Sequence, residues 1–167
     1  MVHEDTSAPV QAVPTMNQEA LFPMPQQKRT SDDYWTPKWI FDALGVQFDL
    51  DVACPPEGPA HTPAHYWYTQ ETDGLASPWF GNVWMNPPFS KTNNWAYRFI
   101  EHKNGICLVP MGKTKWFARL WEESDAVMSL PPNLKFDQGG IFIQTCLFAF
   151  GVENVEAMKR SKIGRVR

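Results

Sequence analysis

Four consecutive residues, 86–89, combine the groups needed to recognise an amine on a flat ring. The amide oxygen of Asn86 and the carbonyl oxygen of Pro87 are two acceptors on a backbone that Pro87 and Pro88 stiffen. Phe89 offers a face on which a base can stack, an interaction that contributes about 1–3 kcal/mol per base. An amine whose two hydrogens are held by these acceptors loses conjugation with its ring, so its lone pair becomes available to an electrophile. The same residues, here called the proline corner, could instead form a turn that merely ends a strand.

The sequence before the proline corner predicts where it lies in the fold. The apolar run at residues 83–85 is typical of a short buried strand. Each proline disfavours helical backbone in the residue before it, so the chain leaves this strand as an extended loop. Ligands bind outside the carboxyl ends of the strands in an open α/β sheet, and the proline corner is expected at such an end.

Two upstream segments carry further candidate residues. Thr36 is a good N-cap and Pro37 suits the first helical position, so together they predict a helix that ends before Gly45. The N–H groups at a helix start can receive an anion, although capping alone explains Thr-Pro equally well. Asp49 and Asp51 alternate with apolar residues along a predicted strand at residues 46–53. Two carboxylates there suit a cationic ligand, or both could face water.

Polar residues that follow the proline corner could touch a nucleic-acid backbone, because Lys, Arg and Asn are common phosphate partners. They are Lys91, Asn93, Asn94 and Arg98. A solvated loop and helix face is the alternative. Further along, Lys135 lies in a Leu-Lys-Phe segment that leads into a hairpin-like turn at Gly139-Gly140.

Composition limits the classes of protein that the chain can belong to. Its 167 residues, 43% of them hydrophobic, are enough for one domain with a sizeable core. The net charge of −3 argues against a uniformly basic nucleic-acid binder but permits a local basic face. No apolar stretch is long enough to span a membrane. His61 and His65 have no framing carboxylate or cysteine, so no metal site is expected.

The remaining pattern predicts an α/β domain with three further strands and two further helices. Strands are expected at residues 105–110, 126–130 and 141–150, and helices at 95–102 and 115–121. Residues 1–30 are rich in proline and polar side chains and predict a disordered or loosely attached arm. The domain is expected at residues 31–151, and residues 152–167 are expected to form a basic tail.

The order of these landmarks resembles the phage-type DNA N6-adenine methyltransferases of the Dam-like family. The resemblance covers residues 31–150 and includes the Trp-Thr-Pro start, the Asp-x-Asp strand, an Asp-Gly-Leu turn and the proline corner. It implies a Rossmann-like S-adenosylmethionine-dependent methyltransferase fold of reduced size, with a mostly parallel sheet and a C-terminal antiparallel hairpin. Two features depart from the family pattern. Ala53-Cys54-Pro55-Pro56 replaces the usual glycine-rich cofactor loop, and Phe89 stands where many relatives have tyrosine.

The resemblance also assigns expected roles to the candidate residues. Catalytic roles fall on Asn86, Pro87, Pro88 and Phe89. Cofactor binding falls on Trp35, Thr36, Pro37, Asp49, Asp51 and Asp73. DNA contacts fall on Lys91, Asn93, Asn94, Arg98 and Lys135. The target adenine is expected to leave the DNA helix, because its amine is unreachable inside a duplex, and to attack the sulfonium methyl of S-adenosylmethionine without a covalent enzyme intermediate.

The cytoplasm of a bacterial host cell is the expected location, and the oligomeric state stays open. Several other functions fit the same pocket residues. The acceptor amine could belong to cytosine N4, to an adenine in RNA or to a glutamine side chain in a protein. A nucleic-acid binder that has lost its cofactor is a further alternative, which the missing glycine-rich loop favours.

Overall fold

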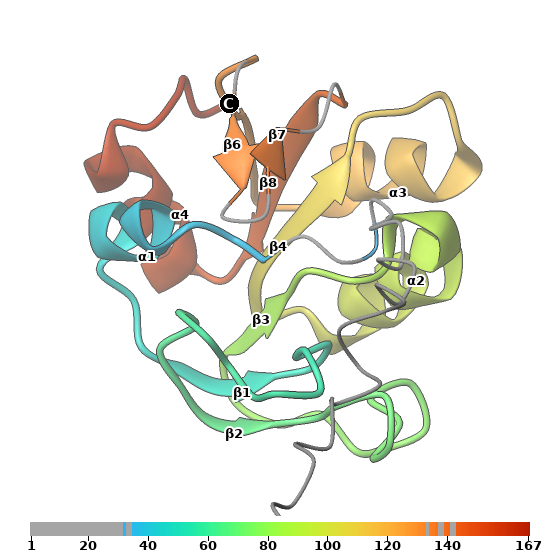
Figure 1. Ribbon diagram of the computed structural model, residues 1–167. Coiled ribbons are helices and arrows are strands. Elements are labelled where there is room, and N and C mark those ends of the chain that lie inside the picture. The colour runs from blue at the N-terminus through green and yellow to red at the C-terminus, as the bar shows by residue number, and fades with distance from the viewer. Residues whose placement is uncertain (1–31, 33–34, 133, 137–138, 141–142) are drawn as a thin grey trace, which may run out of the picture.

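The computed structural model describes residues 32, 35–132, 134–136, 139–140 and 143–167, and the predicted arm at residues 1–30 lies outside them. A six-stranded sheet forms the centre of the molecule, between two pairs of helices (Figure 1). In their order across the sheet, the strands are β2 (Ala64–Trp67), β1 (Phe48–Asp51), β3 (Val83–Met85), β4 (Gly105–Pro110), β8 (Thr145–Phe150) and β5 (Ala126–Ser129). A separate pair, β6 (Lys135–Phe136) and β7 (Gly139–Gly140), forms a small antiparallel ladder.

The sheet is mostly parallel, and one strand runs against the others. β1, β2, β3 and β4 pair in parallel, whereas β8 is antiparallel to both β4 and β5. Five strands therefore end at the same edge of the sheet, which we call the carboxyl edge. The α/β class and the parallel majority were predicted. The reversed strand proves to be interior, inserted between β4 and β5.

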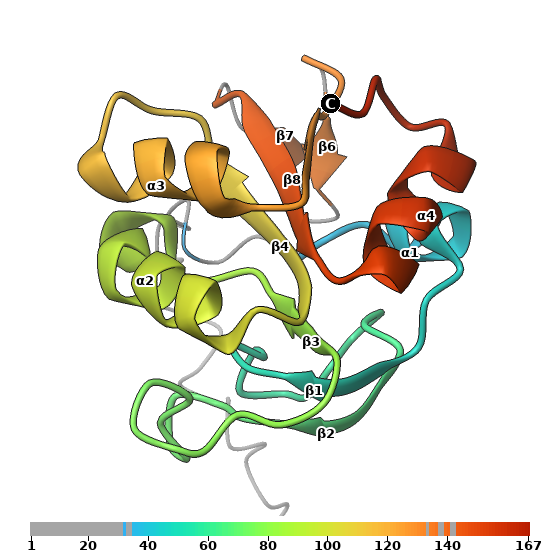
Figure 2. The same ribbon diagram turned by 180° about the vertical axis from the view of Figure 1, so that it is seen from behind.

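Helices cover both faces of the sheet, as the two opposite views show (Figures 1 and 2). One face carries α1 (Lys38–Leu44) and α4 (Val152–Ser161), and the other carries α2 (Thr92–His102) and α3 (Lys115–Glu123). Each face has its own apolar cluster. In β3, Val83 and Met85 join one cluster while Trp84 joins the other. Burial on both faces explains why this strand is apolar at every position.

The C-terminal segment differs from the expected basic tail, because residues 152–161 form α4. Ala157 and Met158 are fully buried, and Asn154 donates hydrogen bonds to the Asn82 side chain and to the Phe150 carbonyl. Beyond the helix, Arg167 exchanges backbone hydrogen bonds with Val127 in β5. The segment contains many charged residues, so its overall composition suggested a tail. The few small and apolar side chains among them form the buried face of the helix.

The order of the strands indicates where a ligand would bind. From β1 the chain moves outward to β2, whereas from β3 it moves to β4 on the opposite side. The connections therefore diverge between β1 and β3. In open α/β sheets ligands bind beside such a switch point, outside the carboxyl ends of the strands. Asp51 ends β1 and the proline corner follows β3, so both lie at this place.

No helix in the described ranges has both the length and the apolar character needed to cross a membrane.

Candidate active site

The proline corner is held by the chain segment that precedes α1. The Asn86 side chain donates a hydrogen bond from Nδ2 to Thr36 Oγ1, at 3.2 Å. Thr36 is only 5% exposed, and Asn86 is half-buried. Just past the corner, the Ser90 backbone N–H and hydroxyl both donate to the carboxylate of Asp32, at 2.9 and 2.5 Å. Two contacts from one segment thus fix the chain on both sides of the prolines.

The bond to Thr36 corrects one expectation and gives the threonine another task. Helix α1 begins at Lys38 with Pro37 as its N-cap, and the Thr36 side chain makes no capping hydrogen bond. The Thr36 hydroxyl instead meets the amide of Asn86 across a separation of 50 residues. Because Nδ2 faces Thr36, the amide oxygen faces the other way. This orientation suits an acceptor for an incoming amine.

Phe89 begins a short 3-10 helix, η2 (Phe89–Lys91), that leads into α2. Thr92 Oγ1 donates to the Phe89 carbonyl at 3.1 Å, which stabilises this tight turn. The Phe89 ring is half-buried and packs against the apolar cluster beneath α1 and α4. Pro87 is buried and Pro88 is half-buried. The corner is therefore anchored by its apolar side chains, while its aromatic ring keeps part of its surface exposed.

Asp51 supplies a buried carboxyl group at the end of β1, where it pairs in register with Trp84 of β3. It is 2% exposed, which excludes the alternative that it faces water. Its Oδ1 accepts from the Ala53 N–H at 3.1 Å, and the Thr62 side chain also bonds to the carboxyl group. Burial raises the pKa of Asp51 from 3.8 to about 6, against the smaller opposing effect of these hydrogen bonds. A cation placed beside Asp51 would favour its charged form.

The Asp73 turn packs directly against the end of β1. Asp73 has a positive φ of 48°, and its carboxylate accepts from the N–H groups of Leu75 and Ala76. A Cβ added to Gly74 would lie 1.9 Å from the Val52 carbonyl oxygen, so only glycine allows this approach. The turn therefore brings Asp73 to the same end of β1 as Asp51, with part of its carboxylate engaged by its own backbone.

The structure places Asp49 at the opposite edge of the sheet. Its Oδ2 accepts from the Asn82 N–H at 2.7 Å, which ties the start of β1 to the residue before β3. This carboxylate is also packed closely against Gly81. Asp49 therefore lies apart from Asp51 and Asp73. The two carboxylates of the Asp-x-Asp pattern therefore have different surroundings: Asp51 lies at the carboxyl end of β1, and Asp49 contacts the residue before β3.

The polar residues proposed for DNA contacts fall into two groups. Lys91, Asn93 and Asn94 are exposed around η2 and the start of α2, and Lys135 is exposed on β6. Arg98 is half-buried, with its guanidinium 5.0 Å from the centre of the Trp79 ring. It also donates to the Ser77 carbonyl oxygen at 2.5 Å. These contacts give Arg98 a structural task on the outer side of α2.

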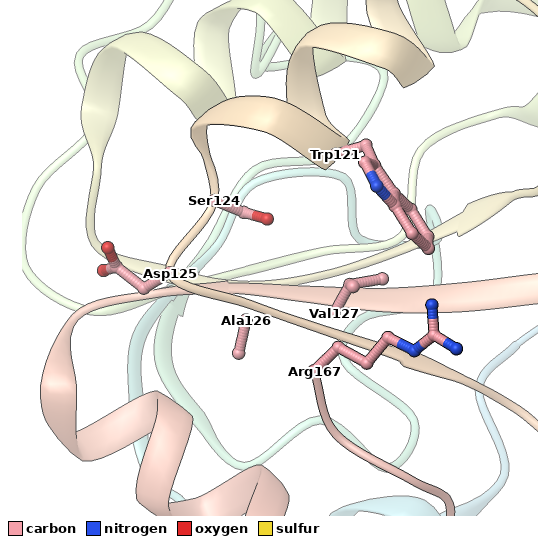
Figure 3. A pocket seen from close by; sticks show the side chains of 6 residues that line it. All are labelled: Trp121, Ser124, Asp125, Ala126, Val127 and Arg167. Carbon is pink, nitrogen blue, oxygen red and sulfur yellow. The ribbon is translucent and has the colours of Figure 1, made fainter.

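Two hollows lie outside the proline corner. One, of about 520 Å³, is lined by Leu75, Asn94, Tyr97, Arg98 and Glu101. The other, of about 280 Å³, lies at the amino end of β5 and is lined by Trp121, Ser124, Asp125, Ala126, Val127 and Arg167 (Figure 3). The second touches none of the predicted site residues. Among the described residues, no three His, Cys, Asp or Glu side chains gather as a metal site would require.

Two residues with contacts at the site and two exposed lysines near it were not identified as site residues from the sequence. Asp32 and Thr62 bond to Ser90 and Asp51, and neither belongs to a recognisable motif. Lys113 and Lys115 are exposed in the loop after β4 and at the start of α3. Their place directly after a predicted parallel strand was a signal that could have marked them. The half-buried Trp35 and buried Pro37 complete the segment beside Thr36.

Comparison with known proteins identifies the family to which the chain belongs. Residues 25–141 match the family described as DNA N-6-adenine-methyltransferase (Dam). The match includes Thr36, Asp51, Asp73 and the whole proline corner. The chain therefore belongs to the Dam family of DNA N6-adenine methyltransferases.

Two curated relatives carry the same description, DNA N-6-adenine-methyltransferase. The protein of Haemophilus phage HP1 (strain HP1c1) is 33% identical over 102 residues, which cover 54% of this chain and 57% of that protein. The protein of Escherichia phage T1 is 30% identical over 119 residues, which cover 65% of this chain and 49% of that protein. The chain thus spans about half the length of the curated relatives it matches.

Proposed function

We propose that this protein transfers a methyl group from S-adenosylmethionine to the N6 amine of adenine in DNA. The observation that carries the proposal is the Asn86 amide, held by Thr36 at the switch point of the sheet beside the buried Asp51. Membership of the Dam family and the descriptions of both phage relatives support the reaction class. We propose that the catalytic domain, expected at residues 31–151, extends through α4, because Met158 and Val155 join the apolar cluster on its face of the sheet.

The residues at the carboxyl edge fit a cationic methyl donor. Asp51 places a buried carboxyl group at the switch point, and Asp73 places a second one at the same end of β1. S-adenosylmethionine carries a sulfonium and an ammonium, which these two carboxyl groups would attract, and Ala53-Cys54-Pro55-Pro56 would take the place of the glycine-rich loop. Asp51 and Asp73 would hold the donor on its cationic side, with Trp35 and Pro37 lining the opposite wall. We propose the Rossmann-like methyltransferase fold on the same grounds.

The proline corner prepares the acceptor for the reaction. The adenine leaves the duplex and stacks on Phe89, while the Asn86 amide oxygen and the Pro87 carbonyl accept the two amine hydrogens. S-adenosylmethionine, when bound, would supply an electrophilic methyl group and would leave as a neutral thioether. Asn86 and Pro87 would keep the amine lone pair directed at that methyl group, and the methylated amine would release one proton to water. Positioning and preorganised dipoles lower the barrier, so no covalent enzyme intermediate is needed.

The cysteines do not support a route through a thiolate nucleophile, which methylation of a ring carbon would require. Cys54, Cys107 and Cys146 are all buried and free. Cys54 lies nearest to Asp51 in the sequence, and burial with the nearby carboxylates raises its pKa to about 12. A thiol with such a pKa stays protonated near neutral pH. The transfer to an exocyclic nitrogen is therefore favoured.

Methyl transfer to unmethylated DNA, followed by digestion to nucleosides, tests the proposal. We expect N6-methyl-2′-deoxyadenosine from the wild-type protein and none from Asn86→Ala, which removes one acceptor. Isothermal titration with S-adenosylmethionine should show binding by both proteins, because Asn86 is assigned to the base. N4-methylcytosine as the product would favour the cytosine alternative. No heat of cofactor binding would favour a binder without catalysis.

A further inference from the structure

Charge is divided between the two halves of the carboxyl edge. The loops that follow β1 and β2 carry Glu57, Glu71 and Asp73, in addition to the buried Asp51. On the other side of the proline corner, Lys113 follows β4 and Lys115 begins α3. The described residues 111–119, 130–132 and 134–136 include no acidic side chain, and the Asp32 carboxylate next to Lys91 is engaged by Ser90. In sequence order along the sheet, the corner thus lies between the acidic loops after β1 and β2 and the lysines after β4; these halves are here called the acidic half and the basic half.

The strand register raises the basic half above the proline corner. Met85, the last residue of β3, pairs with Cys107, and β4 continues to Pro110. Three further residues correspond to about 10 Å of extended chain. The loop with Lys113 therefore begins well beyond the level at which the proline corner leaves the sheet. Val109 and Ser129 both pair with Cys146, so β5 ends near the same height.

Lys135 and Lys91 extend the basic half toward the proposed base pocket. Lys135 lies between the buried Leu134 and Phe136, which join the apolar cluster against which Phe89 packs. Lys91 ends η2, two residues after Phe89. These lysines are exposed, and the described part of the chain gives none of them a salt bridge. Their charge is therefore available to a ligand in solution.

We propose that Lys113 and Lys115, together with Lys91 and Lys135, form a lysine rim that binds the DNA phosphates flanking the target base. The proposal rests on the proposed function and adds to it the surface that holds the DNA backbone. A flipped base enters the pocket only if the duplex on both sides of it is held nearby, and phosphates offer contacts that do not depend on sequence. The acidic half would repel the same backbone, so the DNA must approach over β4 and β5.

The salt dependence of DNA binding measures the lysine rim directly. Each phosphate contact lowers the slope of log K against log salt by about 0.9 for duplex DNA, because one condensed counterion is released. Lys113→Gln/Lys115→Gln should therefore reduce the magnitude of the slope by about 1.8 and weaken binding about eightfold per lysine at 0.1 M salt. Fluorescence anisotropy with a labelled duplex, titrated at several salt concentrations, gives both quantities for the full chain.

A matched control variant lies at the opposite edge of the sheet. Lys103 is exposed at the C-terminus of α2 with φ 57°, a conformation that asparagine tolerates, so Lys103→Asn removes one positive charge without strain. We expect its slope to equal that of the wild-type protein, whereas Lys113→Gln alone should reduce the magnitude of the slope by about 0.9. The affinity for S-adenosylmethionine should be unchanged in all variants.

The outcomes separate this proposal from the proposed function. If the wild-type protein methylates DNA and Lys113→Gln/Lys115→Gln keeps the full salt slope, the lysine rim is wrong and the reaction stands. An equal loss for Lys103→Asn and Lys113→Gln would also refute the rim, because the effect would be one of net charge. If the wild-type protein binds DNA with the expected slopes but transfers no methyl group, the rim stands and the proposed reaction fails.

Discussion

Thr36→Val tests how the Asn86 amide is oriented. Valine has nearly the shape of threonine, so the substitution keeps the packing of a side chain that is only 5% exposed and removes its hydroxyl. The 3.2 Å bond to Asn86 Nδ2 is lost, and with it a contact that orients the amide. A donor left without its partner in a buried setting costs about 1–3 kcal/mol. If this cost falls on the orientation needed for transfer, kcat should fall about 5- to 150-fold.

The steady-state constants distinguish two roles for the Thr36 hydroxyl. If it orients Asn86, Thr36→Val lowers kcat and leaves the KM for S-adenosylmethionine near the wild-type value. If it binds the cofactor carboxylate, as the resemblance implies, the KM for S-adenosylmethionine rises instead. Thr36→Ser keeps the hydroxyl and should restore most of kcat. An unchanged kcat in Thr36→Val, or a serine variant as impaired as the valine variant, would refute the orienting role.

Three other perturbations have outcomes that the structure predicts. Folding raises the pKa of Asp51 from 3.8 to about 6, so the charged carboxylate lowers the free energy of unfolding by up to about 3 kcal/mol once the pH is above 6. The asparagine of Asp51→Asn cannot ionise, so the Tm of this variant relative to that of the wild-type protein should rise as the pH increases from 4 to 7. A pH-independent difference in Tm would contradict this. Gly74→Ala should lower stability in urea by at least about 1–3 kcal/mol, because its Cβ meets Val52, whereas Gly112→Ala meets nothing closer than 3.9 Å and should be neutral. Arg98→Gln should lower stability by about 1–2 kcal/mol and leave the salt slope of DNA binding unchanged, because its guanidinium is engaged within the protein.

Local rules predicted the elements that carry the site. The apolar run before Asn86 forms β3, and the two prolines end it where expected. Strands β4 and β5 and helices α2 and α3 also lie within a few residues of their predicted ranges. Each of these follows from apolar periodicity or from the backbone limits of proline, which act between near neighbours. The strand expected at residues 141–150 is shorter, and β8 begins only at Thr145.

Contacts between distant residues could not be predicted in the same way. Thr36 lies 50 residues from Asn86, Asp32 lies 58 residues from Ser90, and Asp49 bonds to an N–H 33 residues away. No local pattern marks such pairs, because the order of the strands brings them together. The sequence shows that Asp49 and Asp51 alternate with apolar residues. It does not show that Asp49 bonds to Asn82 before β3 while Asp51 bonds to Ala53 after β1.

The arrangement of charge explains why a neutral residue suits position 86. In the function proposed above, the acidic half of the carboxyl edge would attract a cationic donor, and the proposed lysine rim would attract DNA. A carboxylate in place of Asn86 would add a negative charge at the border, where the phosphates must approach. The amide keeps an acceptor oxygen without that charge, but an amide can present either its oxygen or its NH2 group to the base. Because Thr36 accepts a hydrogen bond from the NH2 group of Asn86, the amide oxygen faces the other way. A neutral amide at position 86 therefore needs the bond to Thr36 in order to present its oxygen to the base.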